Sequence, residues 1–203
     1  MSSETSSPAA DLAFMRSLVE GGGVPAAFGE GYLAAGLIYG GQVVLQGAQG
    51  VIWPHAPSLV TLALGVAPTL LFCLALVWII RRHPGPATGG YASRAMGALF
   101  GCIGLANFVL MAVIGIEAAR AKSFEVWLIY PCVVFVMQGA CWLAAAAVRR
   151  RRWHALVALG WFATAVLMAL ALTNMAAFTM IAVIGLIGFM AVPGAIMLRL
   201  ARR

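Results

Sequence analysis

The chain has 203 residues, of which 63% are hydrophobic and only 9% are charged, and its formal net charge is +7. A soluble domain is about 45–50% apolar and about 25% charged. The composition therefore excludes a soluble globular domain, a disordered chain and a secreted disulfide scaffold. It predicts an all-α integral membrane protein in which most of the chain is membrane.

The chain opens with a polar segment that precedes its first apolar run. Residues 1–7 are rich in serine and are expected to be a disordered tail. Residues 8–23 predict a short amphipathic helix on the cytoplasmic side, because Ser7 is a hydroxyl N-cap before Pro8 and glycines at 21–23 end the helix. Such a helix either lies on the membrane or docks a partner, or it only covers the inner face of the bundle.

This N-terminal region carries a resemblance to a known group. Residues 11–20, DLAFMRSLVE, are followed by glycines and then by a glycine-rich first span. The stretch 11–45 resembles a group of small uncharacterised bacterial multi-pass inner-membrane proteins. The resemblance implies a bacterial inner membrane and implies no mechanism.

Six membrane spans follow from the positions of the charges. Four stretches contain no Asp, Glu, Lys or Arg: 31–80, 95–116, 126–148 and 153–198. A helix needs about 20 apolar residues to cross the hydrocarbon, so the two long stretches hold two spans each. They divide at the two prolines of residues 53–57 and near Thr173 and Asn174. The predicted six-helix membrane domain, 31–198, has spans at about 31–51, 58–80, 95–116, 126–148, 153–172 and 176–198.

The basic residues set the expected orientation. With the N-terminus inside, 11 of the 13 lysines and arginines lie in cytoplasmic segments, and only Arg120 and Lys122 lie outside. Both termini, including a basic tail at 199–203, are therefore expected in the cytoplasm. The net charge is read as a signal for topology and lipid headgroups, and no nucleic-acid partner is expected. The arginines assigned to this role are Arg81, Arg82, Arg149, Arg150, Arg151 and Arg152.

Neutral polar side chains inside the spans are the candidate site. Four of them, spaced 3, 4 and 3 residues apart, share one face of the first span, and two amides lie near the middle of the third and fourth spans. They form either a polar cavity or hydrogen bonds between helices, typically worth about 0.6–2 kcal/mol each. These residues are Tyr39, Gln42, Gln46, Gln49, Asn107 and Gln138.

Ionisable groups are placed at the edges of the predicted spans. His55, His83 and His154 are expected in loops or at interfaces, which argues against haem ligation and against a zinc site. Cys73, Cys102 and Cys141 share one predicted depth, where three thiols could hold Cu(I), but cysteine is also a common small buried residue. No cofactor, metal or catalytic residue is predicted.

Small residues predict close helix packing. Gly36 with Gly40, and Ser93 with Gly97 and Gly101, form small-xxx-small pairs that allow two helices to approach within the bundle or in a dimer. The expected partners are therefore the lipid bilayer, a second copy of the chain or a cytoplasmic protein.

Three functions stay open. The first is a non-enzymatic interaction or regulatory membrane protein whose cytoplasmic face docks a partner. The second is a small transporter or channel for a neutral or lipophilic solute, which would pass the layer of Gln42, Asn107 and Gln138. A membrane enzyme is the least favoured, because no Ser/His/Asp set, histidine cluster or acidic pair is placed to work together.

Overall fold

The computed structural model describes residues 26–83 and 91–201. In these ranges the chain is helical and contains no strand, which confirms the prediction of an all-α protein. The predicted tail 1–7 and the predicted helix 8–23 lie outside the described residues. The helices are α2 (Ala26–Ile52), α3 (Ser58–Arg82), α4 (Tyr91–Ala121), α5 (Phe124–Arg149), α6 (Arg152–Leu170), α7 (Met175–Leu186) and α8 (Val192–Ala201), with a π-helical turn, η1 (Ile187–Ala191), between the last two.

Five of the predicted spans correspond to helical segments that are long and apolar enough to cross a membrane. They are Ser58–Arg82, Ala95–Ala121, Phe124–Arg149, Arg152–Leu170 and Met175–Ala201. The predicted span 31–51 lies in α2, which has 27 residues but is less apolar, since it contains three glutamines and Glu30. The chain is therefore a multi-pass membrane protein by the length and composition of its helices.

The breaks between helices have local causes. The two prolines at 54 and 57 separate α2 from α3, as the sequence predicts. On that same side of the bundle, the side chains of Ser123 and Asn174 cap α5 and α7 by accepting from the backbone N–H groups of Val126 and Ala177. Asn174 is the polar point at which the sequence predicts the last turn.

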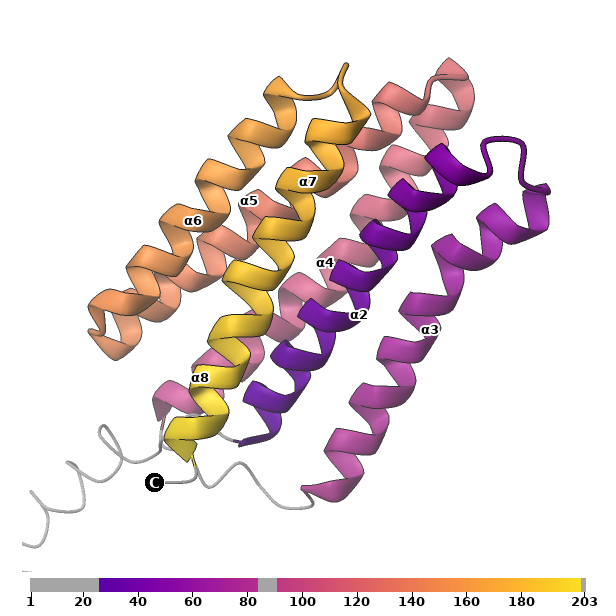
Figure 1. The fold of residues 1–203 in the computed structure, drawn as a ribbon. Helices are drawn as coiled ribbons and strands as arrows, with labels where there is room; N and C mark the ends of the chain where they lie inside the picture. The colour runs from indigo at the N-terminus through magenta and orange to yellow at the C-terminus, as the bar shows by residue number, and fades with distance from the viewer. Residues whose placement is uncertain (1–25, 84–90, 202–203) are drawn as a thin grey trace, which may run out of the picture.

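The last span is one continuous rod with a π-turn at its centre. Val192 N–H donates to Ile187 O, five residues back, and Pro193 follows directly. A proline has no N–H for the helix and its ring displaces the preceding turn, so a local π adjustment is an expected response. Figure 1 shows α7 and α8 running in line between α6 and α2.

The helices form a row that folds back on itself. α3 packs on α2, α2 packs on α7, η1 and α8, α7 packs on α6, α6 packs on α5, and α5 packs on α4 (Figure 1). α3 and α4 stand at the two ends of this row and share no packed interface in their described parts.

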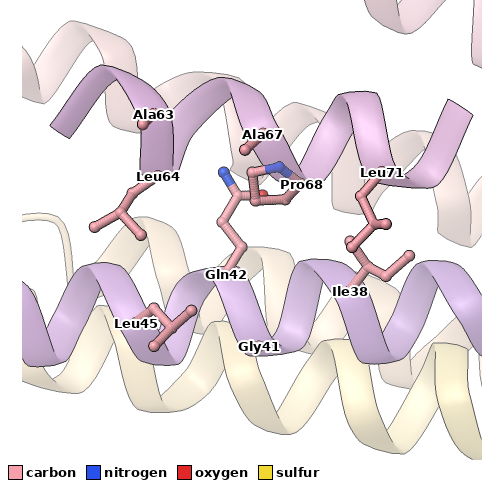
Figure 2. Close-up of a pocket in the computed structure, with 9 residues that line it drawn as sticks. All are labelled: Ile38, Gly41, Gln42, Leu45, Ala63, Leu64, Ala67, Pro68 and Leu71. Atoms are coloured by element: carbon pink, nitrogen blue, oxygen red, sulfur yellow. The ribbon is translucent and has the colours of Figure 1, made fainter. Parts of the chain in front are cut away.

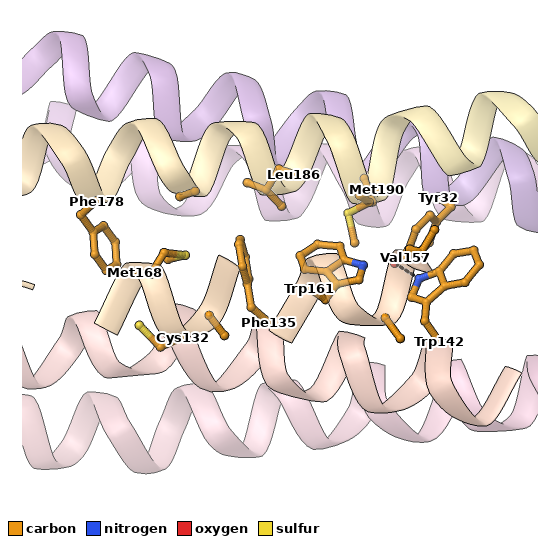
Figure 3. Close-up of a cluster of buried hydrophobic side chains, with 14 of the residues drawn as sticks. Tyr32, Cys132, Phe135, Trp142, Val157, Trp161, Met168, Phe178, Leu186 and Met190 are labelled. Carbon is orange, nitrogen blue, oxygen red and sulfur yellow. Dashed lines mark hydrogen bonds between the residues drawn. The ribbon is translucent and has the colours of Figure 1, made fainter. Parts of the chain in front are cut away.

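The core lies among α2, α5, α6 and the α7–α8 rod. Trp142, Trp161 and Met168 are fully buried there, and the rings of Phe135 and Trp161 meet edge to face at 4.8 Å (Figure 3). Figure 3 shows these side chains stacked along the bundle axis between the helices. The core is therefore filled by aromatic rings and methionines from four helical segments.

Candidate functional site

The polar face of α2 is directed mainly at α3. Gln42 Nε2 donates to Gly65 O (3.2 Å), and Gln49 Nε2 donates to Thr61 Oγ1 (3.1 Å). The ring of Tyr39 packs on Phe72 of α3, with ring centroids 5.5 Å apart. Three of the four predicted residues on this face therefore join α2 to α3.

Gln42 meets α3 at a weak point of that helix. Pro68 lies inside α3 and supplies no N–H to the helix, so the turn before it is less well bonded. Gly65 O belongs to this turn, and the Gln42 amide donates to it from the neighbouring helix. The carbonyl that loses its helical donor to Pro68 is that of Leu64, one residue before Gly65, so the bond has a structural role because it satisfies the Gln42 amide, which is unfavourable in hydrocarbon without a partner.

The fourth residue of this face differs from its neighbours. Gln46 is exposed and makes no hydrogen bond with any described residue. An amide in hydrocarbon is unfavourable without a partner. The Gln46 amide is therefore the polar group of α2 that the bundle leaves unsatisfied.

Asn107 and Gln138 each make their own bond between helices. Tyr130 of α5 donates its hydroxyl to Asn107 Oδ1 of α4 (3.1 Å). The Tyr32 hydroxyl of α2 donates to Gln138 Oε1 of α5 (3.0 Å) and accepts from the indole N–H of Trp142. Figure 3 shows Tyr32 and Trp142 facing each other at one end of the core.

The predicted layer of Gln42, Asn107 and Gln138 is therefore divided among three interfaces. Gln42 bonds α3, Asn107 bonds α5, and Gln138 bonds α2. The structure does not bring the three amides together. The sequence placed them at a similar depth, but depth does not determine which way a side chain is directed around its helix.

His154 lies in the first turn of α6, at the end of a predicted span. The sequence did not indicate that its ring is fully buried there against Trp142 and Trp153, with ring centroids 5.3 and 4.1 Å away. Among the described residues, neither ring nitrogen has a hydrogen-bond partner, and the indole N–H of Trp161 also has none. The core thus surrounds this histidine with indole rings.

The cysteines do not form a metal site in the described residues. Cys73 and Cys102 are exposed on α3 and α4, whereas Cys132 and Cys141 are buried in α5. No group of three His, Cys, Asp or Glu side chains with metal-binding geometry occurs in residues 26–83 and 91–201. The shared depth of Cys73, Cys102 and Cys141 does not bring their thiols together.

The predicted headgroup arginines lie at two helix ends. Arg81 and Arg82 are exposed at the end of α3, where Arg82 lies over the Trp78 ring at 5.1 Å. Arg149 is half-buried and donates to the Met96 sulfur. The other three arginines of this set, Arg150, Arg151 and Arg152, are exposed at the turn between α5 and α6.

Glycines mark the closest contacts of the packed helices. A Cβ at Gly36 would overlap the backbone of Ala191, and a Cβ at Gly194 would overlap that of Leu33. Gly160 and Gly139 similarly receive the rings of Phe189 and Phe162. These glycines allow helices to approach closely.

Three glycines of α4 have no such contact. Gly97, Gly101 and Gly104 are exposed, and a Cβ at any of them would meet nothing within 4 Å. Their spacing of 4 and 3 residues places them on one side of α4. The sequence singled out Gly97 and Gly101 by their four-residue spacing, which does not include Gly104, three residues further along.

Two shallow grooves open on the surface of the bundle. One, of about 340 Å³, lies between α2 and α3 (Figure 2). The other, of about 350 Å³, lies between α2 and α7 and is lined mainly by aliphatic side chains. The walls of the first are apolar except for Gln42, and Figure 2 shows this side chain directed toward Pro68.

Comparison of the chain with protein-family models, with curated proteins and with solved structures finds no match.

Proposed function

We propose that the chain is a six-span protein of a bacterial inner membrane that acts without catalysis, by binding a second protein chain within the bilayer through α4. In this proposal α2 is the sixth span. Its 27 residues extend about 40 Å at 1.5 Å per residue, which exceeds a hydrocarbon core of about 30 Å. Its hydrogen bonds to α3 reduce the cost of placing Gln42 and Gln49 in lipid.

The proposed orientation keeps both termini in the cytoplasm. Arg81 and Arg82 at the end of α3, and the four arginines between α5 and α6, lie on the proposed cytoplasmic side. Binding of a cytoplasmic partner by the predicted helix 8–23 stays a prediction, because that helix lies outside the described residues.

One observation carries the proposal. In the packed part of the bundle glycines lie where helices meet, whereas three glycines of α4 face no described helix. In a membrane, association between helices depends on close packing, so small residues concentrate where helices meet. Gly97, Gly101 and Gly104 have the spacing of such a contact, and a Cβ at any of them has no neighbour within 4 Å among the described residues.

The partner that fits this side of α4 is a second copy of the chain. Gly97 and Gly101 form a G-x-x-x-G pair, which allows two identical helices to cross with the same face on both. Such a symmetric contact is the commonest way in which a chain pairs with itself.

The test is the oligomeric state of the full chain in lipid nanodiscs and in mild detergent. We expect a dimer for the wild-type chain and a monomer for the double variant Gly97→Leu/Gly101→Leu. A Cβ at either position meets no described atom, so the helical fold should be retained, and thermal stability should fall by no more than the contribution of the dimer. The matched control is Gly50→Leu, another open helical position, which should remain a dimer.

Two results would oppose the proposal. A wild-type chain that is monomeric at every concentration in nanodiscs would remove the second copy as partner. A double variant that stays dimeric would place the contact on another face.

Transport of a neutral or lipophilic solute remains the alternative. It needs a shared polar path, and Gln42, Asn107 and Gln138 are engaged in three separate bonds. The exposed Gln46 amide is the observation that favours it, because a water-filled path would hydrate that amide. Uptake into proteoliposomes that is lost in Gln46→Leu would favour transport over binding.

A further inference from the structure

The groove between α2 and α3 has walls that suit a hydrocarbon chain. Its volume is about 340 Å³, near the lower end of the range of roughly 300–1,000 Å³ for ligand pockets. The wall on α2 is formed by Gly41 and its neighbours, and a Cβ at Gly41 would meet nothing within 4 Å. Ala63 and Ala67 form the opposite wall on α3, so small residues on both helices leave the space open (Figure 2).

A row of exposed side chains on one side of α3, here called the α3 stripe, runs from this groove to the arginines at the end of the helix. After Ala67 and Leu71 in the groove, Leu74, Trp78 and Arg82 follow at intervals of three or four residues, so all lie on one side of the helix. All are exposed, and Arg82 lies over the Trp78 ring. The stripe is thus apolar along the span and positive at its end.

The positive charge of Arg81 and Arg82 is not neutralised by an acidic side chain among the described residues. Glu30 of α2 is 3.3 Å from His83, and no described acidic side chain pairs with Arg81 or Arg82. Ten residues separate Leu71 from Arg81, which is about 15 Å along a helix. A molecule with an anionic head at Arg81 and Arg82 therefore needs an apolar tail longer than about 15 Å to enter the groove.

We propose that the α2–α3 groove and the α3 stripe together bind one anionic phospholipid. Its phosphate lies at Arg81 and Arg82, and one acyl chain follows Trp78 and Leu74 into the groove beside Gly41. Charge complementarity selects the headgroup, since a basic residue near the membrane surface attracts anionic lipid by about 1 kcal/mol. The small residues of the groove select the tail. This site is independent of the α4 contact.

The full chain reconstituted in nanodiscs of mixed phosphatidylglycerol and phosphatidylcholine, with identical acyl chains, provides the test. After release into detergent, native mass spectrometry counts the lipid that stays bound. We expect one phosphatidylglycerol per wild-type chain and none in Gly41→Leu, because a Cβ at Gly41 has open space and the rest of the leucine side chain would occupy the groove. Gly50→Leu, an open α2 position outside the groove, is the control and should retain the lipid.

The headgroup is tested separately. The double variant Arg81→Gln/Arg82→Gln should lower the preference for phosphatidylglycerol over phosphatidylcholine by about fivefold for each arginine. Arg150→Gln/Arg151→Gln removes two exposed arginines elsewhere and should leave the preference unchanged. Equal retention by Gly41→Leu and Gly50→Leu would overturn the groove site. An unchanged preference in the Arg81/Arg82 variant, or a bound free fatty acid in place of phospholipid, would overturn the assigned headgroup.

Discussion

Helix α4 and the α7–α8 rod have a similar apolar character but very different surroundings. In the most apolar stretch of the rod 44% of the residues are buried, whereas none is buried in the corresponding stretch of α4. The rod contacts α2, α6 and the core, while α4 packs mainly on α5. Hydropathy therefore indicates that both segments are membranous, but it does not tell which one is surrounded by protein.

Glycine distinguishes the two regions more sharply than hydropathy does. Where α2 meets the rod, Gly36 and Gly194 admit the backbone of the opposite helix. On α4, Gly97, Gly101 and Gly104 admit nothing. The two glycines between α2 and the rod therefore have a partner helix, whereas these three on α4 have none among the described residues, and we infer a contact there with another chain. The division does not hold for every glycine, because a Cβ at Gly188 of the rod would also meet nothing and a Cβ at Gly115 of α4 would lie 3.4 Å from Trp127.

The largest effect is expected from filling a glycine of the packed region. Gly36→Leu would drive a side chain into the backbone of Ala191, which cannot rotate away, and should cost about 3 kcal/mol or more. Thermal unfolding of the purified protein, followed by circular dichroism, measures this loss. Gly97→Leu is the control on α4 and should lower the unfolding temperature much less, because it can lose only the contribution of the dimer contact. Equal destabilisation by the two leucines would remove the distinction between the regions.

A smaller effect is expected from the buried hydrogen bonds. Tyr32→Phe leaves the Trp142 indole N–H and the Gln138 amide oxygen without their partner, and this should cost about 1–3 kcal/mol. Tyr130→Phe breaks the half-buried bond to Asn107 at the edge of the bundle and should cost about 0.6 kcal/mol. Unfolding in a titration with denaturing detergent gives both values. A larger loss for Tyr130→Phe would show that α4 is held as firmly as the core.

The smallest effects on stability are expected from two glutamines on one face of α2, and replacing them should change stability in different directions. Gln42→Leu removes the bond to Gly65 O and should lower stability by about 0.6 kcal/mol. Gln46→Leu removes an exposed amide that has no partner in the described chain, so stability should stay equal or rise. The same detergent titration compares them. A loss for Gln46→Leu as large as that for Gln42→Leu would mean that Gln46 has a partner in the folded protein.

The limits of the helices could be predicted closely from the sequence. The uncharged stretches, the prolines at 54 and 57, and Asn174 mark where helices end, because charge and missing backbone donors act locally. The all-α class follows from the same pattern. The lower hydropathy of α2 comes from its glutamines. They are visible in the sequence, but the spans were predicted from charged residues alone, which do not include glutamine.

The candidate site was less predictable, because it depends on how the helices are rotated and paired. Gln42 and Gln138 have similar depths, yet one bonds α3 and the other bonds Tyr32 of α2. His154 lies beside arginines in sequence, yet its ring is buried among indoles. Such placements depend on tertiary packing, which cannot be derived from the periodicity of a single helix.

A contact between the glycine side of α4 and a second copy of the chain can be tested directly. Disulfide cross-linking in native membranes tests it, in a background where the exposed cysteines are replaced by Cys73→Ala and Cys102→Ala. We expect cross-linked dimers for Gly97→Cys, Gly101→Cys and Gly104→Cys. We expect none for Leu99→Cys and Ile103→Cys, which share the side of α4 that carries Met96 and Asn107 toward α5. No cross-link at any of the five positions, or equal cross-linking at all of them, would rule out a second copy on the glycine side of α4.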